Sequence, residues 1–399
     1  MLDALFSEGQ VSLRMSDQVQ SRNWVAAWYA APSRMISASL SGRTIRQIVH
    51  LYASGEEIRL RLSNRYGDKP VTLTSVSVAH AVKGPLVFGE ERSVTFGGQM
   101  ILQLNPGKEV ISDPIILRVE AFNDLAITFF LSQGDSLTGH WMAQQTSYIS
   151  GPGVVNAKSP EEALFGYPLM TTSWWLITGV DVLPSSPINA LVAFGSSTTD
   201  GAGSTLNANR RWPDYLARKL RDAGSARFMS VINAGLSGNM LTGSMTLEER
   251  IPPFIFGEAG QQRFVWDALG QPSATDLIVH IGSNDIRFGV SGETVIRGMQ
   301  QLANQARKTY RRIFGTTILP GGYSPEQAKQ RKLVNAWMLN QGRQLFDAVF
   351  DFATPLSSRD DEAMLNPAYD SGDGIHPKDE GYHLMAEAID IDQLTGSPR

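Results

Sequence analysis

The chain contains no cysteine among its 399 residues. Disulfide bonds, thiolate zinc sites and a cysteine nucleophile are therefore excluded. The chain also lacks an apolar run near the ~20 residues that a transmembrane helix needs, so no membrane span is predicted. An excess of charge is missing as well, because the net charge is only −4. A nucleic-acid partner, which calls for a strongly basic surface, is not expected.

Residues 1–23 contain no basic region followed by an apolar stretch, so they are predicted to be an N-terminal extension and not a secretory signal. The protein is accordingly expected in the cytoplasm, or outside it if a leader has been removed. With 42% hydrophobic and 19% charged residues, the composition is typical of a globular protein. The length suits two domains, and the oligomeric state is left open.

The sequence changes character near residues 184–187. Before this point, in a predicted accessory domain spanning residues 24–184, short alternating or β-branched stretches are separated by turn residues. In the stretch 57–62, for example, Arg59 and Arg61 alternate with apolar residues. Other stretches of this kind lie at 44–51, 71–78 and 125–131. The pattern predicts an all-β sandwich or jelly roll.

Apolar strands alternate with helices in the second predicted domain, residues 185–399. The predicted strands are 191–194, 228–232, 277–281 and 313–319, and the predicted helices are 212–223, 293–312 and 325–345. This alternation predicts a three-layer α/β/α domain around a parallel sheet. Such sheets bind ligands at the carboxyl ends of their strands. The long connection 240–273 is predicted to be an extra helix, a lid or part of the domain contact.

Ser197 is the candidate nucleophile. The apolar stretch 191–194 ends in a turn of small residues, Gly195-Ser-Ser-Thr-Thr-Asp-Gly201, and this turn carries Ser197. A serine hydroxyl is a poor nucleophile unless a neighbouring base takes its proton and a third group holds that base in the right tautomer. The sequence must therefore supply a base and an orienting group elsewhere.

His376 is the candidate base, because it is the histidine with a carboxylate at a useful spacing. Asp373 precedes it by three residues in the segment Asp373-Gly-Ile-His-Pro377. A tight turn there can fold the carboxylate onto Nδ1 of the imidazole and leave Nε2 facing outward. By itself, the same segment is also typical of a surface turn that opens a helix at 378–388.

Hydrogen-bond donors for a developing oxyanion can be assigned to three further groups. Small residues in Leu236-Ser-Gly-Asn239 let a backbone N–H approach closely, which favours Gly238 N–H. Asn284, which follows the predicted strand 277–281, offers a side-chain amide, and Ser197 N–H is the third candidate. Alone, the pair Asn284-Asp285 is also typical of a helix cap or a turn.

These four segments resemble the four blocks of the SGNH (GDSL-type) hydrolases. The matching residues are Ser197, Gly238, Asn284 and His376, with Asp373 three residues before the histidine, and the match spans about residues 187–391. The first half of the chain also resembles the β-domain that precedes the hydrolase in a bacterial subgroup of such esterases. The resemblance implies an ester hydrolase that needs no cofactor and no metal.

One position departs from the family pattern. The usual first block is Gly-Asp-Ser, whereas this chain has Gly195-Ser196-Ser197. Any bracing that the missing carboxylate gives must come from elsewhere, with Thr198, Thr199 and Asp200 as the nearby candidates. Ser196 is an alternative nucleophile. Another nucleophile motif, the Gly-x-Ser-x-Gly elbow of the α/β-hydrolases, is not present, since Thr199 occupies its last position.

The predicted activity is hydrolysis of short-acyl esters through an acyl-enzyme. The resemblance implies small-molecule or carbohydrate esters, such as O-acetyl groups of carbohydrates and aryl esters, as substrates. One alternative is an acyltransferase that passes the acyl group to a sugar or another alcohol. A second alternative is a polysaccharide-binding protein with an idle serine site.

Several polar residues outside the four blocks are predicted to be structural. His140 and His280 belong to no cluster with metal-ligand spacing, so we expect them to be packing residues. His383 is expected to pack or to lie on the surface of the helix after the His376 turn. Asp285 is expected to fix the loop that holds its neighbour Asn284.

Overall fold

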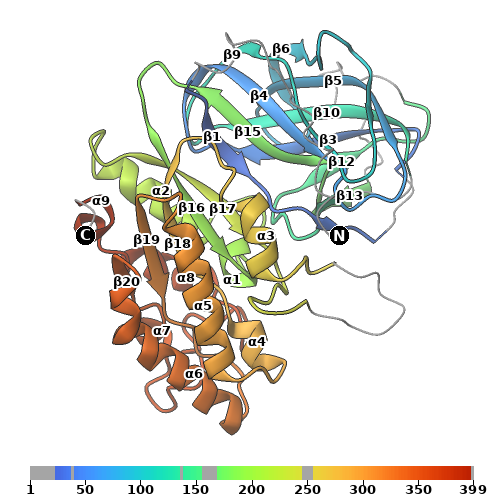
Figure 1. Cartoon of the computed structure of the whole chain (residues 1–399). Helices are drawn as coiled ribbons and strands as arrows, with labels where there is room; N and C mark the ends of the chain where they lie inside the picture. Colours follow the sequence, from blue (N-terminus) through green and yellow to red (C-terminus); the bar gives the residue numbers. More distant parts are fainter. Residues whose placement is uncertain (1–22, 37–39, 135–137, 155–168, 245–254, 397–399) are drawn as a thin grey trace, which may run out of the picture.

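The structure is a computed structural model that describes residues 23–36, 40–134, 138–154, 169–244 and 255–396. The predicted N-terminal extension therefore lies outside the described residues, except for Asn23. Figure 1 shows a β-rich region formed by the first half of the chain, next to a second region in which helices surround a sheet. The predicted fold class, an all-β region followed by an α/β domain, is confirmed.

The β-rich region contains two large antiparallel sheets and one small one. The first sheet consists of β1 (Val25–Tyr29), β15 (Ile177–Leu183), β4 (Gly55–Ser63) and β8 (Glu109–Ile111) in this order, with β9 (Ile115–Val119) also paired to β4. The second consists of β13 (Leu169–Thr171), β12 (Ser147–Ile149), β3 (Arg43–His50), β10 (Asp124–Gln133), β5 (Val71–Ala81) and β6 (Val87–Ser93), with β7 (Leu102–Leu104) also on β5. The small sheet is β14 (Trp174–Trp175), β11 (Thr138–His140) and β2 (Ser33–Arg34).

The four stretches predicted as strands in this region are strands β3, β4, β5 and β10. Their alternation has the expected cause, since residues from both large sheets contribute to one hydrophobic core. On β4, Leu60 and Leu62 face this core, while Arg59 and Arg61 face the other side and form ion pairs with Asp181 of β15. Buried leucines and paired arginines thus fix the register of β4.

The second region is built on a five-stranded parallel sheet. Its strand order is β17 (Met229–Gly235), β16 (Asn189–Gly195), β18 (Ala274–His280), β19 (Arg312–Thr316) and β20 (Ala348–Phe350). Helices α3 (Gly260–Asp267), α5 (Gly292–Ala306) and α6 (Pro325–Leu339) pack on one face. Helices α2 (Trp212–Asp222), α7 (Ala353–Leu356), α8 (Asp379–Glu387) and α9 (Ile391–Thr395) pack on the other. The predicted three layers are present.

Two predicted helix ends were wrong. Helix α5 ends at Ala306 rather than 312, because Tyr310 turns inward to donate a hydrogen bond to Ala268 O (2.6 Å) and Arg312 already belongs to β19. Helix α6 ends at Leu339, and a 3₁₀ turn, Gln341–Gln344, follows it. The strand predicted to reach 319 ends at Thr316, and the short strand β20 was not predicted.

The two regions meet along β1, which lies against β17 of the parallel sheet. Ser230 on β17 donates a hydrogen bond to Ala26 O (2.7 Å), and Tyr29 donates to Asp267 at the end of α3 (2.7 Å). The boundary predicted between residues 184 and 185 falls between β15, the last strand of the β-rich sheets, and β16. Since all these contacts are buried, the junction is part of the folded core rather than a loose linker.

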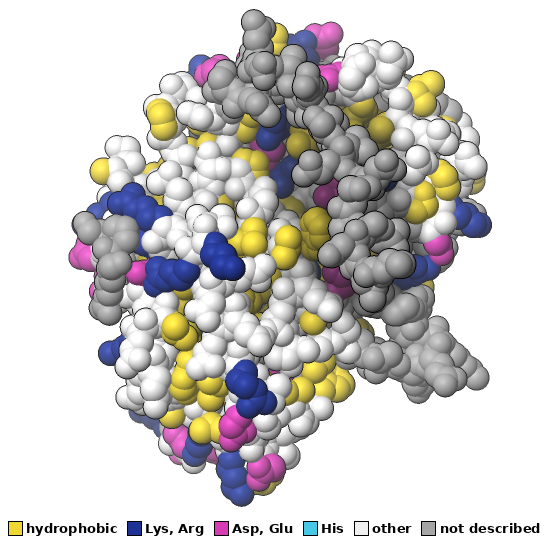
Figure 2. Space-filling view, in the orientation of Figure 1, with side chains coloured by type: hydrophobic (Ala, Val, Ile, Leu, Met, Phe, Trp, Pro, Cys, Tyr) yellow, Lys and Arg dark blue, Asp and Glu magenta, His cyan; other side chains and the backbone are white. Residues whose placement is uncertain are grey.

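Among the described residues, no helix is both long enough and apolar enough to cross a membrane. On the face seen in Figure 2, basic and acidic side chains lie close to one another near the lower edge, with uncharged surface between such groups. Within the described part of that face, charge of one sign does not form a broad patch.

Candidate active site

The candidate site residues lie at the carboxyl ends of neighbouring parallel strands. Numbered by their position in the chain, the five strands lie in the spatial order 2-1-3-4-5. The connections from β16 and to β18 therefore run in opposite directions across the sheet, and a switch point lies between these two strands. Ligands of doubly wound sheets bind at this kind of switch point. Ser197 comes directly after β16, and Asn284 lies in α4 (Ser283–Arg287), just after β18. The topology therefore brings the first and third blocks together.

Ser197 is the first residue of the short helix α1 (Ser197–Asp200). Gly195 allows this abrupt strand-to-helix turn, because a Cβ there would lie 2.0 Å from Thr199 Oγ1 and 2.5 Å from His280 O. Gly201 ends the helix in the left-handed region (φ 104°) and donates its N–H to Ser197 O (2.8 Å). Two glycines thus present Ser197 at the strand end.

The structure brings Ser197, His376 and Asp373 into one hydrogen-bonded chain. Ser197 Oγ lies 2.9 Å from His376 Nε2, and His376 Nδ1 lies 2.6 Å from Asp373 Oδ2. The other oxygen of Asp373 accepts the N–H groups of Ile375 and His376, each at 2.8 Å. When Nδ1 carries the proton and donates it in a hydrogen bond to Asp373, Nε2 is free to accept the serine proton.

The carboxylate of Asp373 is kept ionised. Partial burial raises its pKa, but hydrogen bonds from the His376 side chain and from the N–H groups of His376 and Ile375 together outweigh burial, so the pKa lies below the usual 3.8. The loop is closed by Ser371, whose N–H donates to His376 O (2.9 Å). A charged acceptor in a closed loop therefore fixes the ring of His376.

The second and third blocks are tied to the nucleophile turn by hydrogen bonds. Leu236 N–H donates to Gly195 O (3.1 Å), and Asn284 Nδ2 donates to Asn239 O (2.9 Å), next to Gly238. Gly238 has a positive φ of 78°, and a Cβ there would meet the Phe256 ring at 2.3 Å, so only glycine fits. Both sequence-predicted oxyanion residues thus lie beside the Ser197 turn.

Asp285 holds the same loop, in the way the sequence predicted. Its carboxylate accepts the N–H of Leu241 (2.7 Å) and both the N–H and the hydroxyl of Thr242 (2.9 and 2.7 Å). Asp285 is fully buried, and its oxygens face this loop rather than His376. It acts on the site through the position of the 239–242 loop.

Asp200, the last residue of α1, connects the Ser197 turn to two other segments. Asp200 Oδ2 accepts the N–H and the hydroxyl of Ser237 (2.9 and 2.5 Å), so it links the Ser197 turn to the loop of Gly238. Its other oxygen lies 2.8 Å from His140 Nε2, and His140 belongs to the β-rich region. Of the three bracing candidates, Asp200 is the one whose carboxylate makes this link.

Arg263 of α3 is a buried residue beside the site that the sequence analysis did not identify. Its guanidinium is 1% exposed and donates to Gly195 O (2.7 Å), Ala234 O (3.1 Å) and Asn239 Oδ1 (2.7 Å). It also forms an ion pair with Asp267 (2.7 Å). The long connection 240–273 therefore contributes an extra helix, which holds the ends of β16 and β17 through Arg263. It also contributes part of the contact between the two regions.

His280 and His383 lie outside the Ser197–His376–Asp373 chain. Burial lowers the pKa of His280 to about 4, and its Nδ1 lies 2.7 Å from Thr316 Oγ1. His383 is exposed on α8, 3.7 Å from Glu387. Within the described residues, no three His, Asp or Glu side chains gather in a way that could hold a metal ion. The prediction for His140 was incomplete, since this residue contacts the nucleophile turn through Asp200 rather than only packing.

A parallel sheet whose strand ends carry a Ser–His–Asp chain defines a serine hydrolase architecture. Residues 193–384 match the model of the GDSL-like Lipase/Acylhydrolase family. Residues 193–384 therefore form a GDSL-like lipase/acylhydrolase domain, and this domain supports ester hydrolysis as the activity. The resemblance found in the four sequence blocks is confirmed.

Solved structures with similar folds cover about half of the chain. A GDSL-like lipase from Bacteroides thetaiotaomicron is 18% identical and is matched over 88% of its own length and 51% of this chain, with a TM-score of 0.36. The psychrotrophic esterase EstA from Pseudoalteromonas sp. is 16% identical over 93% of its length and 50% of this chain, with a TM-score of 0.38. AlinE4, an SGNH-hydrolase family esterase, is 22% identical over 93% of its length and 51% of this chain, with a TM-score of 0.36. None of the curated proteins compared with the chain matches it.

Proposed function

We propose that the protein hydrolyses short-acyl carboxylic esters, among them O-acetyl groups of carbohydrates and aryl esters, through an acyl-enzyme on Ser197. The observation that carries this proposal is the chain from Ser197 Oγ through His376 (2.9 Å) to Asp373 (2.6 Å). A hydroxyl bonded to a base, with the base bonded to a carboxylate, is the arrangement that activates a serine.

The reaction follows from this geometry in two halves. His376 Nε2 takes the Ser197 proton as Oγ bonds to the ester carbon, and the imidazolium then gives that proton to the departing alcohol. The acyl group now remains on Ser197. Water attacks it while His376 again takes a proton, and the carboxylic acid leaves as the proton returns to Oγ. Asp373 stays ionised and stabilises the imidazolium in each half.

The oxyanion of both halves is assigned to Ser197 N–H, Gly238 N–H and the side chain of Asn284. Asn284 Nδ2 carries two protons and uses one for Asn239 O, so the second can point at the substrate oxygen. Replacing Asn284 with alanine should lower kcat about 10²- to 10³-fold, while KM changes little, since the donor is needed mainly in the transition state. Steady-state kinetics with p-nitrophenyl acetate measures both constants. A rise in KM of the same size with an unchanged kcat would contradict this role.

Two aromatic residues beside Gly238 support a preference for short acyl groups. The ring of Phe256 lies directly against Gly238, and Trp141 packs on Phe256 with ring centroids 5.9 Å apart. Little room remains on this side of the oxyanion loop for a long acyl chain. Replacing Phe256 with alanine is therefore expected to raise kcat/KM for octanoyl relative to acetyl esters by roughly tenfold, since removal of a large side chain opens space for several methylene groups. The control is Phe288→Ala, which removes an exposed aromatic side chain directly after α4. An unchanged ratio in the Phe256 variant would argue against a role of Phe256 in limiting acyl length.

The test of the proposed function combines acyl-length kinetics with labelling of the nucleophile. Hydrolysis of p-nitrophenyl esters from acetyl to dodecanoyl should be fastest for the shortest chains, and a phosphonate inhibitor should form one adduct, found on the peptide that contains Ser197. Acetate release from an acetylated sugar then tests the carbohydrate substrates. A new ester formed with an added alcohol, in preference to free acid, would favour the acyltransferase. No labelling of Ser197 would contradict the mechanism.

A further inference from the structure

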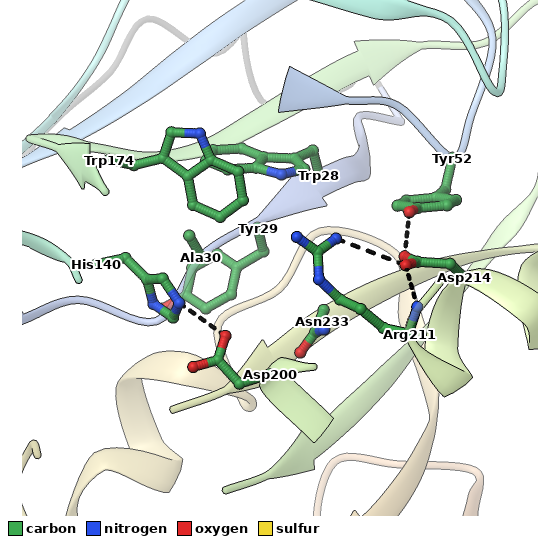
Figure 3. A pocket seen from close by; sticks show the side chains of 10 residues that line it. All are labelled: Trp28, Tyr29, Ala30, Tyr52, His140, Trp174, Asp200, Arg211, Asp214 and Asn233. Carbon is green, nitrogen blue, oxygen red and sulfur yellow. Dashed lines mark hydrogen bonds and ion pairs between the residues drawn. The ribbon is translucent and has the colours of Figure 1, made fainter. Parts of the chain in front are cut away.

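A buried histidine of the β-rich region reaches the nucleophile turn of the hydrolase domain. His140, at the end of β11, is 3% exposed, and its Nε2 lies 2.8 Å from Oδ1 of Asp200 in α1. Figure 3 shows this bonded pair in the lining of a small pocket, with Trp28 and Trp174 from the β-rich region and Asn233 from the hydrolase domain. The contact joins residues that are 60 positions apart in the sequence.

Both ring nitrogens of His140 face hydrogen-bond acceptors. Nδ1 lies 2.8 Å from Ala31 O, and Nε2 faces Asp200 Oδ1 at 2.8 Å and Met142 O at 3.2 Å. A neutral imidazole carries one proton and would leave one of these nitrogens lone pair to lone pair with an oxygen. The imidazolium satisfies both sides. The geometry therefore favours a buried ion pair between His140 and Asp200.

Asp200 also binds the oxyanion loop, residues 236–239, which contains Gly238. While Oδ1 is held by His140, Oδ2 accepts the N–H and hydroxyl of Ser237, the residue directly before Gly238. The chain His140–Asp200–Ser237 thus fixes the direction of the peptide that carries Gly238 N–H. A small rotation of that peptide would move the donor away from the oxyanion, where misplacement is costly.

We propose that His140 is a positioning residue of the hydrolase, and that the β-rich region completes the active site by holding the oxyanion loop through the His140–Asp200 ion pair. This inference rests on the proposed function, because it assigns Gly238 N–H to the oxyanion. It also gives the β-rich region a task in catalysis that needs no polysaccharide ligand.

The pair has a definite pH dependence. Burial by itself lowers the pKa of His140, but the charge of Asp200 and the hydrogen bonds to Asp200, Ala31 and Met142 outweigh it, so the pKa is raised above 6.5. His140 therefore carries its charge below this raised pKa, and the ion pair is lost as the pH rises through it. The other charged or titratable groups lining the same pocket are Tyr29, Tyr52, Arg211 and Asp214.

The test compares His140→Gln with a matched variant that also loses a buried bond across the junction. Tyr52→Phe removes the hydrogen bond from Tyr52 to Asp214 and leaves the chain from His140 to Ser237 intact. For His140→Gln, kcat for p-nitrophenyl acetate should fall roughly 10- to 100-fold with little change in KM. The alkaline decline of kcat should also be absent, because glutamine does not titrate. Tyr52→Phe should keep kcat within about twofold of the wild type, even if it unfolds at a lower temperature.

A second variant follows the same chain from its other end. Ser237→Ala removes one of the two bonds to Asp200, and its loss of kcat should not multiply with that of His140→Gln in the double variant, since both act through one carboxylate. A kcat of His140→Gln no lower than that of Tyr52→Phe, or an unchanged alkaline decline, would overturn the proposal. Phosphonate labelling of Ser197 in the wild type tests the proposed function separately, so either idea can fail alone.

Discussion

Replacing Ser197 with alanine is expected to lower ester hydrolysis by a factor on the order of 10⁴ to 10⁶, to a residual rate supplied by the oxyanion donors and by substrate binding. The reason is that Ser197 Oγ is the hydroxyl bonded to His376 Nε2 (2.9 Å), so its removal leaves the base without a nucleophile. The turn itself should survive, because the backbone contacts of residue 197 involve its carbonyl. The measurement is kcat/KM for p-nitrophenyl acetate, with circular dichroism to verify folding.

Ser196→Ala is the matched control, since the two serines are adjacent. Ser196 is 1% exposed and supports the turn through its carbonyl, which accepts the N–H groups of Thr199 (3.0 Å) and Asp200 (2.9 Å) and is retained in alanine. We expect this variant to keep activity within about an order of magnitude of the wild type. The reverse result, with activity lost in Ser196→Ala and kept in Ser197→Ala, would show that the nucleophile has been placed one residue too far along the chain.

The parts of the site that could be predicted are those in which local sequence reports geometry. Ser197 and Asn284 each follow an apolar strand, and the carboxyl ends of parallel strands meet at one edge, so their proximity follows from the fold class. Asp373 and His376 are three residues apart around a turn, and a contact of this kind is set by local backbone geometry. Strand periodicity likewise predicted β3, β4, β5 and β10, because burial on one face produces alternation.

The parts that could not be predicted depend on contacts between distant segments. His140 and Asp200 are 60 residues apart, and neither belongs to a periodic pattern that indicates its partner. Arg263 reads as an ordinary helical arginine, although its four partners are carbonyl or side-chain oxygens supplied by three other segments and by its own helix. Helix α5 was predicted too long for the same kind of reason, since the position of Tyr310 is decided by Ala268 and not by helix propensity.

Arg263 is also the residue whose loss we expect to destabilise the fold most. Arg263→Met should lower the free energy of unfolding by about 3–5 kcal/mol, because it leaves the buried carboxylate of Asp267 without its cation and frees the acceptors at Gly195 and Asn239. For a domain of this size, the thermal midpoint should fall by roughly 10 °C. Arg263→Lys should recover only part of the loss, since an ammonium cannot reach all of these acceptors as the guanidinium does.

Two further variants show whether Arg263→Met is destabilised by the missing charge or only by the loss of a large side chain. Arg297→Met on the neighbouring helix α5 removes an exposed arginine whose hydrogen bond goes to Thr294 in its own helix. The thermal midpoint of this variant should stay near that of the wild type. Adding Asp267→Asn to Arg263→Met should restore stability if the uncompensated carboxylate is the main cost, because the amide still accepts the Tyr29 hydroxyl and carries no charge. A double variant less stable than Arg263→Met would instead assign the cost to the orphaned carbonyl of Gly195. In that case the ester-hydrolysis rate should fall together with stability, since this carbonyl lies two residues before Ser197 and sets the start of the nucleophile turn.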